Sequence, residues 1–132
     1  MEDFVNFDLA KKIKEKGYPQ VKENTLAMYN EEGEWFSLAR NLDEFEYCFD
    51  DFDEHDCVAP TISQVLNWMR ELLEIDILPK IAISLSENLD NINLYSCNIH
   101  SPKLNKPIEG RYFKSFKEAA LSGIEYVLDN LI

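Results

Sequence analysis

Glycine and histidine are scarce in this chain of 132 residues, which holds four glycines and two histidines. So few glycines leave little room for a phosphate-binding loop, and the sequence contains neither a P-loop nor a GxGxxG motif. The HExxH zinc motif and the GxSxG nucleophile motif are absent as well. The sequence does not decide whether the protein is an enzyme, but these absences favour a non-enzymatic protein without a cofactor.

Long hydrophobic runs are also missing, because no apolar stretch approaches the length of a membrane span. The chain begins with acidic residues and shows no apolar core of a signal peptide. Its three cysteines, Cys48, Cys57 and Cys97, form no CxxC pair, and an odd number suits a reducing compartment. We therefore expect a cytoplasmic protein that has no membrane partner.

Three amphipathic segments predict helices. The first runs over 6–16 and stops at Gly17, which suits a left-handed cap and is followed closely by Pro19. The third begins at Ser115, whose Ser-x-x-Glu pattern is that of a capping box, and runs to about residue 130. Gly123 lies on or near its apolar face and predicts close packing against a sheet. That face is expected to carry Phe116, Ala119, Ala120, Ile124, Val127, Leu128 and Leu131.

The second helix is predicted over 62–74, after another capping-box pattern that begins at Thr61. Trp68 lies off the centre of its apolar stripe and is expected to be half-exposed. The stripe itself consists of Ile62, Val65, Leu66, Met69, Leu72 and Leu73.

Alternating or turn-bounded apolar runs predict strands. They cover 25–30, 34–39, 45–49, 75–85, 92–100 and 108–113. The first two form a hairpin around Gly33, and Pro79 makes the fourth an edge, a bulge or a break. We expect one α+β domain over residues 1–132, with three helices on a mainly antiparallel sheet of five to six strands. The element order is α-β-β-(β)-α-β-β-β-α.

Charge is unevenly distributed along the chain. The net charge is −12, and no Lys or Arg occurs between Arg40 and Arg70. Eight acids fall in that segment, so it supplies two-thirds of the net charge: Asp43, Glu44, Glu46, Asp50, Asp51, Asp53, Glu54 and Asp56. Such a charge opposes direct binding to nucleic acid.

The acidic segment predicts a protein-interaction module that docks on a basic protein surface. The residues expected to bind this partner are Asp50, Asp51, Asp53, Glu54 and Asp56. Two alternatives remain open. In one, the acids are only a solvated surface. In the other, Asp51, Asp53 and His55 belong to a Ca²⁺ or Mg²⁺ site, or to the active site of a small metal-dependent enzyme. Their spacing loosely resembles the start of an EF-hand loop, but the glycine and the final Glu of that loop are absent.

Zinc is a weaker candidate. His55, Cys57, Cys97 and His100 supply the ligand types of a structural site. However, Cys97 and His100 are an odd number of residues apart in a predicted strand, so their side chains point to opposite faces. We expect no metal there.

Positive charge gathers in 103–117, where five bases surround Glu109. This region is an ordinary surface or faces the acidic segment, within one chain or across a homodimer. The apolar C-terminal end, Leu131 and Ile132, is either part of the packed core or a second candidate for a dimer seam.

Several short segments of the chain form a recognisable pattern. They are Leu9-Ala10-Lys11, Gly17-Tyr18-Pro19, Met28-Tyr29, Gly33-Glu34-Trp35-Phe36, Ala59-Pro60-Thr61, Val65-Leu66-Asn67-Trp68-Met69-Arg70-Glu71, Glu118-Ala119-Ala120-Leu121 and Ile124. This pattern resembles a family of small uncharacterised proteins encoded in genomes of gut anaerobes, their prophages and other mobile elements. The resemblance covers most of the chain and implies a shared fold and a phage or mobile-element context, but no activity and no site residue.

Overall fold

The computed structural model divides the chain into two compact units, Met1–Thr61 and Ile62–Ile132. It describes residues 3–21, 25–37, 52–82, 94–102, 104, 108–109, 113 and 115–132. Within these residues no helix is both long and apolar enough to cross a membrane. The expectation that residues 1–132 form one domain stays a prediction.

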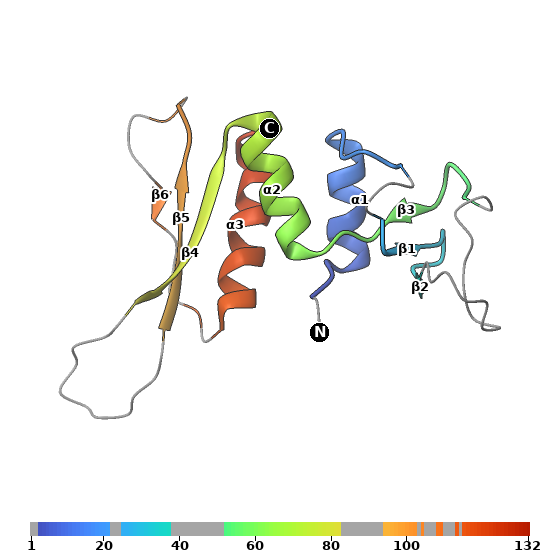
Figure 1. Cartoon of the computed structure of the whole chain (residues 1–132), viewed down its shortest axis with the longest axis horizontal. Helices are drawn as coiled ribbons and strands as arrows, with labels where there is room; N and C mark the ends of the chain where they lie inside the picture. The colour runs from blue at the N-terminus through green and yellow to red at the C-terminus, as the bar shows by residue number, and fades with distance from the viewer. Residues whose placement is uncertain are drawn as a thin grey trace. The chain divides into compact units, whose positions relative to one another are not determined.

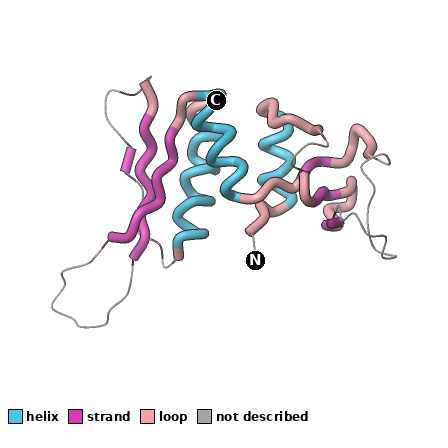
Figure 2. Tube along the Cα trace, in the orientation of Figure 1, coloured by secondary structure: helices cyan, strands magenta, loops and turns pink. Residues whose placement is uncertain are grey.

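The first unit consists of one helix and a three-stranded sheet (Figures 1 and 2). Helix α1 covers Phe7–Glu15, and the strands are β1 (Ala27–Tyr29), β2 (Trp35–Ser37) and β3 (Cys57–Val58). The sheet order is β2-β1-β3, and both strand pairs are antiparallel. Helix α1 packs beside β3, and its buried residues Leu9, Ala10 and Ile13 belong to the core of this unit.

Both ends of α1 are fixed by local hydrogen bonds. The Asn6 side chain accepts from the Leu9 N–H at 2.9 Å, which caps the first turn. Gly17 has φ +98°, and the Tyr18 N–H donates to the Ile13 carbonyl at 3.0 Å. This is the glycine-dependent helix end that the sequence predicts.

The predicted hairpin is confirmed. Asn30 organises its turn, since its side-chain oxygen accepts from the backbone N–H groups of Glu32 and Glu34, each at 2.9 Å. Gly33 has φ +85°, and a Cβ atom there would lie 2.8 Å from the Phe7 ring. Position 33 therefore requires glycine for two reasons: the positive φ strains other residues, and a side chain would clash with Phe7 of α1.

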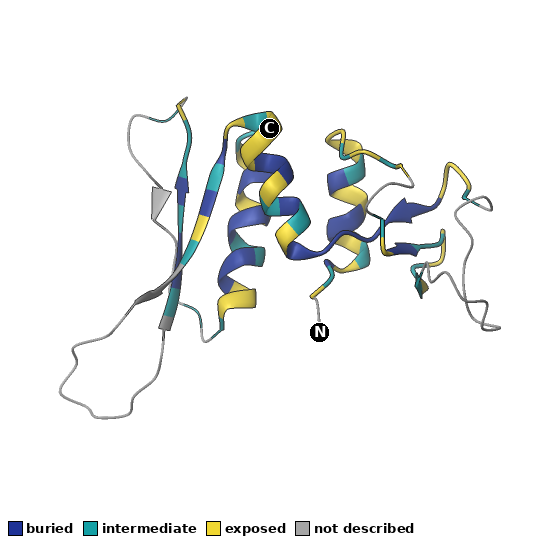
Figure 3. Ribbon diagram, viewed as in Figure 1, coloured by how far each residue is buried: buried dark blue, intermediate teal, exposed yellow. Residues whose placement is uncertain are grey.

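The second unit packs two helices against another three-stranded antiparallel sheet. Its elements are α2 (Ile62–Leu73), β4 (Asp76–Ala82), β5 (Leu94–His100), β6 (Ile108–Glu109) and α3 (Phe116–Asn130). The sheet order is β4-β5-β6, α3 packs against β4 and β5, and α2 packs against α3 and β4. The buried residues of α3 lie on one side of the helix (Figure 3).

Strand β4 contains Pro79 without a break. Seven residue pairs join β4 to β5 in continuous register, including Pro79 with Cys97. Among the described strands β4 has a neighbour on one side only, so the missing N–H of Pro79 is tolerated. Of the three outcomes predicted for this proline, the structure shows the edge strand.

The predicted single sheet of five to six strands is not confirmed, because the described strands form two sheets of three. Strands β1, β2 and β3 precede α2 in the chain and pair with one another. Strands β4, β5 and β6 follow α2 and form the second sheet. Strand β3 directly follows Asp56, the last acid of the acidic segment, and the sequence does not predict it, because a strand of two residues shows no periodicity. The strand predicted over 45–49 lies outside the described residues.

Three predictions about helix faces are wrong. Trp68 is buried, with 8% exposure, because it stands one turn from Val65 and widens the buried side of α2. Leu72 is 67% exposed because the helix ends one residue later. Phe116 is 50% exposed at the first position of α3, where its ring meets the edge of Tyr95.

Gly123 permits the close contact between α3 and the sheet. A Cβ atom on Gly123 would lie 2.5 Å from the Cys97 Sγ and 2.7 Å from the Ile77 Cγ2. These distances are far shorter than a normal van der Waals contact, so the helix could not stay where it is with a larger residue. The close packing predicted at Gly123 is confirmed.

We therefore expect Gly123→Ala to lower the free energy of unfolding, although alanine is the better helix former by about 1 kcal/mol. Overpacking of this kind costs about 1–3 kcal/mol, which exceeds that gain. Urea denaturation measures the change, with the neighbouring Ser122→Ala as the control. Adding Cys97→Ala to Gly123→Ala should recover part of the loss. An increase in stability with Gly123→Ala alone would contradict the packing argument.

Candidate functional site

The described part of the acidic segment is a closed turn over residues 52–56, called here the acidic turn. The Asp56 N–H donates to the Asp53 carbonyl at 3.0 Å, and the Asp56 carboxylate accepts from the Asp53 N–H at 2.9 Å. The Asp53 carboxylate in turn accepts from the His55 N–H at 3.1 Å. Two of the acids therefore fix the backbone of the turn that carries them.

Lys14 of α1 binds the inner side of the acidic turn. Its Nζ donates to the carbonyl oxygen of Glu54 at 2.5 Å and to that of Asp56 at 2.6 Å. The same ammonium lies 5.9 Å from the centre of the Phe52 ring. The backbone of the turn thus binds a cation that the protein itself supplies, and the two hydrogen bonds join residues 40 and 42 positions apart.

The acids of the turn face different surroundings. Asp53 and Glu54 are exposed, whereas the Asp56 side chain is buried, with 5% of the residue exposed. Asp50 and Asp51 lie outside the described residues. Of the five residues predicted to bind a partner, the structure therefore brings three together and leaves two of their carboxylates accessible. The binding role itself stays a prediction.

Asp53, Glu54 and His55 form the one metal-compatible group found within the described ranges. Each offers a ligand atom, and these atoms lie within 4.8 Å of one another. All three side chains are exposed, and the His55 Nε2 is 3.5 Å from a Glu54 oxygen. Asp51, the first residue of the predicted Ca²⁺-like pattern, lies outside the described residues.

The buried thiols are poor nucleophiles. Burial raises the pKa of Cys97 to about 11, and its Sγ faces Gly123 of α3. Burial also raises the pKa of Cys57, outweighing the opposing effect of Lys14. His100, three residues after Cys97, instead lines a surface pocket, as the strand alternation predicts.

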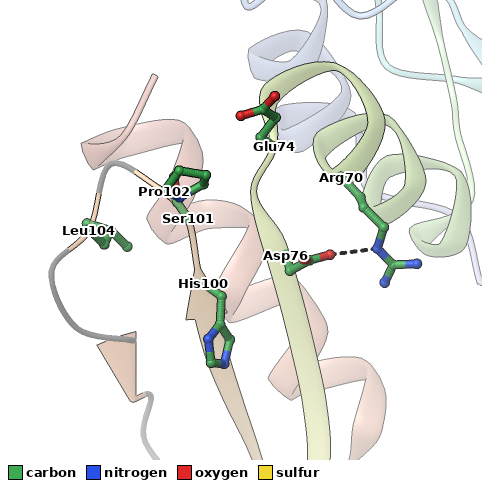
Figure 4. A pocket seen from close by; sticks show the side chains of 7 residues that line it. All are labelled: Arg70, Glu74, Asp76, His100, Ser101, Pro102 and Leu104. Carbon is green, nitrogen blue, oxygen red and sulfur yellow. Dashed lines mark hydrogen bonds and ion pairs between the residues drawn. The ribbon is translucent and has the colours of Figure 1, made fainter.

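That pocket lies in the second unit, between the turn that enters β4 and the end of β5. Its volume is about 420 Å³, and its lining residues are Arg70, Glu74, Asp76, His100, Ser101, Pro102 and Leu104 (Figure 4). The Arg70 Nε donates to an Asp76 oxygen at 2.7 Å, and Asp76 stands opposite His100 in the β4–β5 register. Sequence reasoning missed this site, because its charged residues come from separate elements.

No family model, curated protein or solved structure matches the chain. The resemblance to the mobile-element family therefore stays a prediction.

Replacing Lys14 by methionine keeps most of the aliphatic stem but removes the ammonium. We expect Lys14→Met to lower the free energy of unfolding by about 1–2 kcal/mol, because two carbonyls lose a charged donor. Lys12→Met, on the exposed side of the same helix, is the matched control and should change stability by less. Equal effects of the two changes in urea denaturation would show that Lys14 does not anchor the turn.

The raised thiol pKa values predict slow chemical labelling of the folded protein. With a pKa of about 11, only about a thousandth of Cys97 is thiolate at pH 8. In a Cys48→Ser background, a thiol reagent should label Cys57 and Cys97 slowly in the folded state and rapidly in urea. The rate for the folded state should rise with pH. Rapid labelling at pH 7 without denaturant would contradict this environment.

Proposed function

We propose that the protein is a non-enzymatic interaction module whose acidic segment docks on a basic protein surface. The observation that carries the proposal is the exposure of Asp53 and Glu54 on a turn that Lys14 fixes to α1. Around this turn, 29 consecutive residues between Arg40 and Arg70 contain eight acids and neither Lys nor Arg. The phage or mobile-element context implied by the resemblance belongs to the same proposal.

A fixed turn suits this role for an energetic reason. A flexible loop loses conformational entropy when it binds, whereas the backbone of the acidic turn is already held by Lys14 and Asp56. The exposed carboxylates of Asp53 and Glu54 stay hydrated while the protein is unbound. Charge of one sign over a local surface mainly raises the association rate and makes it sensitive to salt.

Divalent-cation binding is the second candidate, and the convergence of Asp53, Glu54 and His55 favours it. Cation binding has less support than docking, because Ca²⁺ takes about six to eight oxygen ligands and these exposed side chains supply fewer. The carbonyls of Glu54 and Asp56, which are further oxygen ligands, already bind the Lys14 ammonium.

The docking proposal predicts a salt-sensitive partner that depends on the exposed acids. The test is affinity capture from host lysate with a variant that carries Asp50→Asn, Asp51→Asn, Asp53→Asn and Glu54→Gln. Asp56 stays unchanged because its buried carboxylate holds the turn, whereas the amide oxygen introduced by Asp53→Asn can still accept from the His55 N–H. A basic protein should bind wild type at low salt and dissociate at high salt, and EDTA should not change its binding. The variant should not bind it.

A matched control removes the same number of charges elsewhere in the first unit: Glu15→Gln, Glu31→Gln, Glu32→Gln and Glu34→Gln. This control should retain the partner, and the purified partner should reproduce the ranking in titration calorimetry. Loss of binding in both variants would indicate unspecific charge attraction, and equal binding by all three proteins would refute docking. A rise in melting temperature with Ca²⁺ or Mg²⁺ that Asp53→Asn weakens, since a carboxylate oxygen is lost, would favour the cation site.

A further inference from the structure

Trp35 is the most exposed aromatic residue among those described in the first unit. It lies in β2 opposite Tyr29 of β1, and 47% of it is exposed. Tryptophan is highly buried on average, and it is enriched among the residues that dominate binding at protein interfaces. Trp35 is therefore a candidate for an interface anchor.

The ring of Trp35 is held in a fixed place. Phe4 contacts it, with the ring centres 5.5 Å apart and the ring planes inclined by 66°. The next residue, Val5, is bound on both sides: its N–H donates to the Pro60 carbonyl at 3.0 Å, and its carbonyl accepts from the Tyr29 hydroxyl at 2.6 Å. An aromatic side chain that is already ordered loses little conformational entropy when a partner binds.

Two other aromatic rings of the first unit already face a cation. The Lys11 Nζ lies 4.6 Å from the centre of the Phe7 ring. The Lys14 Nζ lies 5.9 Å from the centre of the Phe52 ring. Among the described residues no Lys or Arg lies over the Trp35 ring. The indole ring is the strongest aromatic acceptor of such a cation, so a partner can supply the one that Trp35 lacks.

The charge of the first unit selects a cationic partner. Residues 1–61 contain 16 acids and six Lys or Arg residues, a net charge of −10 out of −12 for the chain. Such a field attracts cationic side chains and repels anionic ones. A neutral apolar segment gains nothing from it.

Trp35 and the acidic turn lie close enough for one partner to contact both. Tyr29 pairs with Trp35 on one side and with Cys57 on the other. Cys57 is the residue directly after the acidic turn. Neighbouring strands are about 4.8 Å apart, so about 10 Å separates the backbones of Trp35 and Cys57. One side of a standard interface, about 800 Å², covers both.

We propose that Trp35 anchors the basic partner by stacking on an arginine side chain of that partner. This inference rests on the proposed docking function and adds a specific contact to it. A guanidinium is planar and weakly hydrated, so it stacks on an aromatic ring more readily than an ammonium does. The acidic turn raises the association rate, and the stacked ring slows dissociation.

The probe is a fluorescein-labelled hexa-arginine peptide, titrated into the full-length protein at low salt and followed by fluorescence polarisation. Trp35→Leu keeps an apolar side chain but removes the ring, and it should weaken binding about two- to fivefold, as expected for a cation–π contact at an exposed site. Trp35→Phe keeps a ring and should lose less. Tyr126→Leu, at another exposed aromatic residue, in α3, is the control and should bind like wild type.

A hexalysine peptide with the same label tests the stacking itself. Partial unfolding of Trp35→Leu would lower the affinity for both peptides alike, whereas loss of stacking lowers mainly the affinity for hexa-arginine. The preference for hexa-arginine should therefore fall in Trp35→Leu. An unchanged preference, or equal weakening by Trp35→Leu and Tyr126→Leu, would overturn the proposal.

A variant without the exposed acids separates this inference from the docking proposal. It carries Asp50→Asn, Asp51→Asn, Asp53→Asn and Glu54→Gln. If this variant loses hexa-arginine binding and Trp35→Leu does not, docking stands and the role of Trp35 is refuted. If neither variant weakens binding, both proposals are refuted. Weaker binding by each variant supports both.

Discussion

The first unit depends on one cation–carbonyl contact, that of the Lys14 ammonium with the acidic turn. An ammonium partly withdrawn from bulk water needs acceptors, and the carbonyls of Glu54 and Asp56 supply two of them. Asp56 directly precedes Cys57, the first residue of β3. The lysine therefore fixes the point at which the chain returns from the acidic segment to pair with β1.

The same contact separates the groups of the acidic turn that bind Lys14 from those that stay exposed. In the acidic turn, the carbonyl oxygens of Glu54 and Asp56 face Lys14, and the Asp56 carboxylate accepts a hydrogen bond within the turn. The carboxylates of Asp53 and Glu54 remain outside. Concentrating negative charge in one segment is unfavourable by itself, and a cation placed beneath the turn offsets part of that repulsion. The turn can therefore be ordered and strongly charged at once, which is the property that docking by charge requires.

Much of the fold could be predicted from local sequence. The end of α1 follows from Gly17, the hairpin from Gly33, and the start of α3 from Ser115, whose side chain accepts from the Glu118 N–H at 3.1 Å. Each of these features depends on residues within a few positions of one another. Gly123 could be predicted too, because a glycine on an apolar helix face indicates that a neighbouring element approaches the helix closely.

The features that the sequence did not predict depend on distant residues. Strand β3 exists because two residues meet β1, about 30 positions earlier in the sequence, and no periodicity marks it. Lys14 was one of several basic residues at a helix end, and only the folded chain shows which of them the turn binds. The pocket likewise combines Arg70 with Asp76 and His100 through the β4–β5 register.

The most direct test of the Lys14 contact is NMR of the lysine ammonium groups at low temperature and mildly acidic pH. The structure predicts that the ¹⁵Nζ signal of Lys14 is protected from exchange with water and shows through-hydrogen-bond couplings to the carbonyl carbons of Glu54 and Asp56. Exposed lysines exchange too quickly to show such couplings. Rapid exchange at Lys14, equal to that of Lys12, would contradict the claim that this ammonium holds the acidic turn.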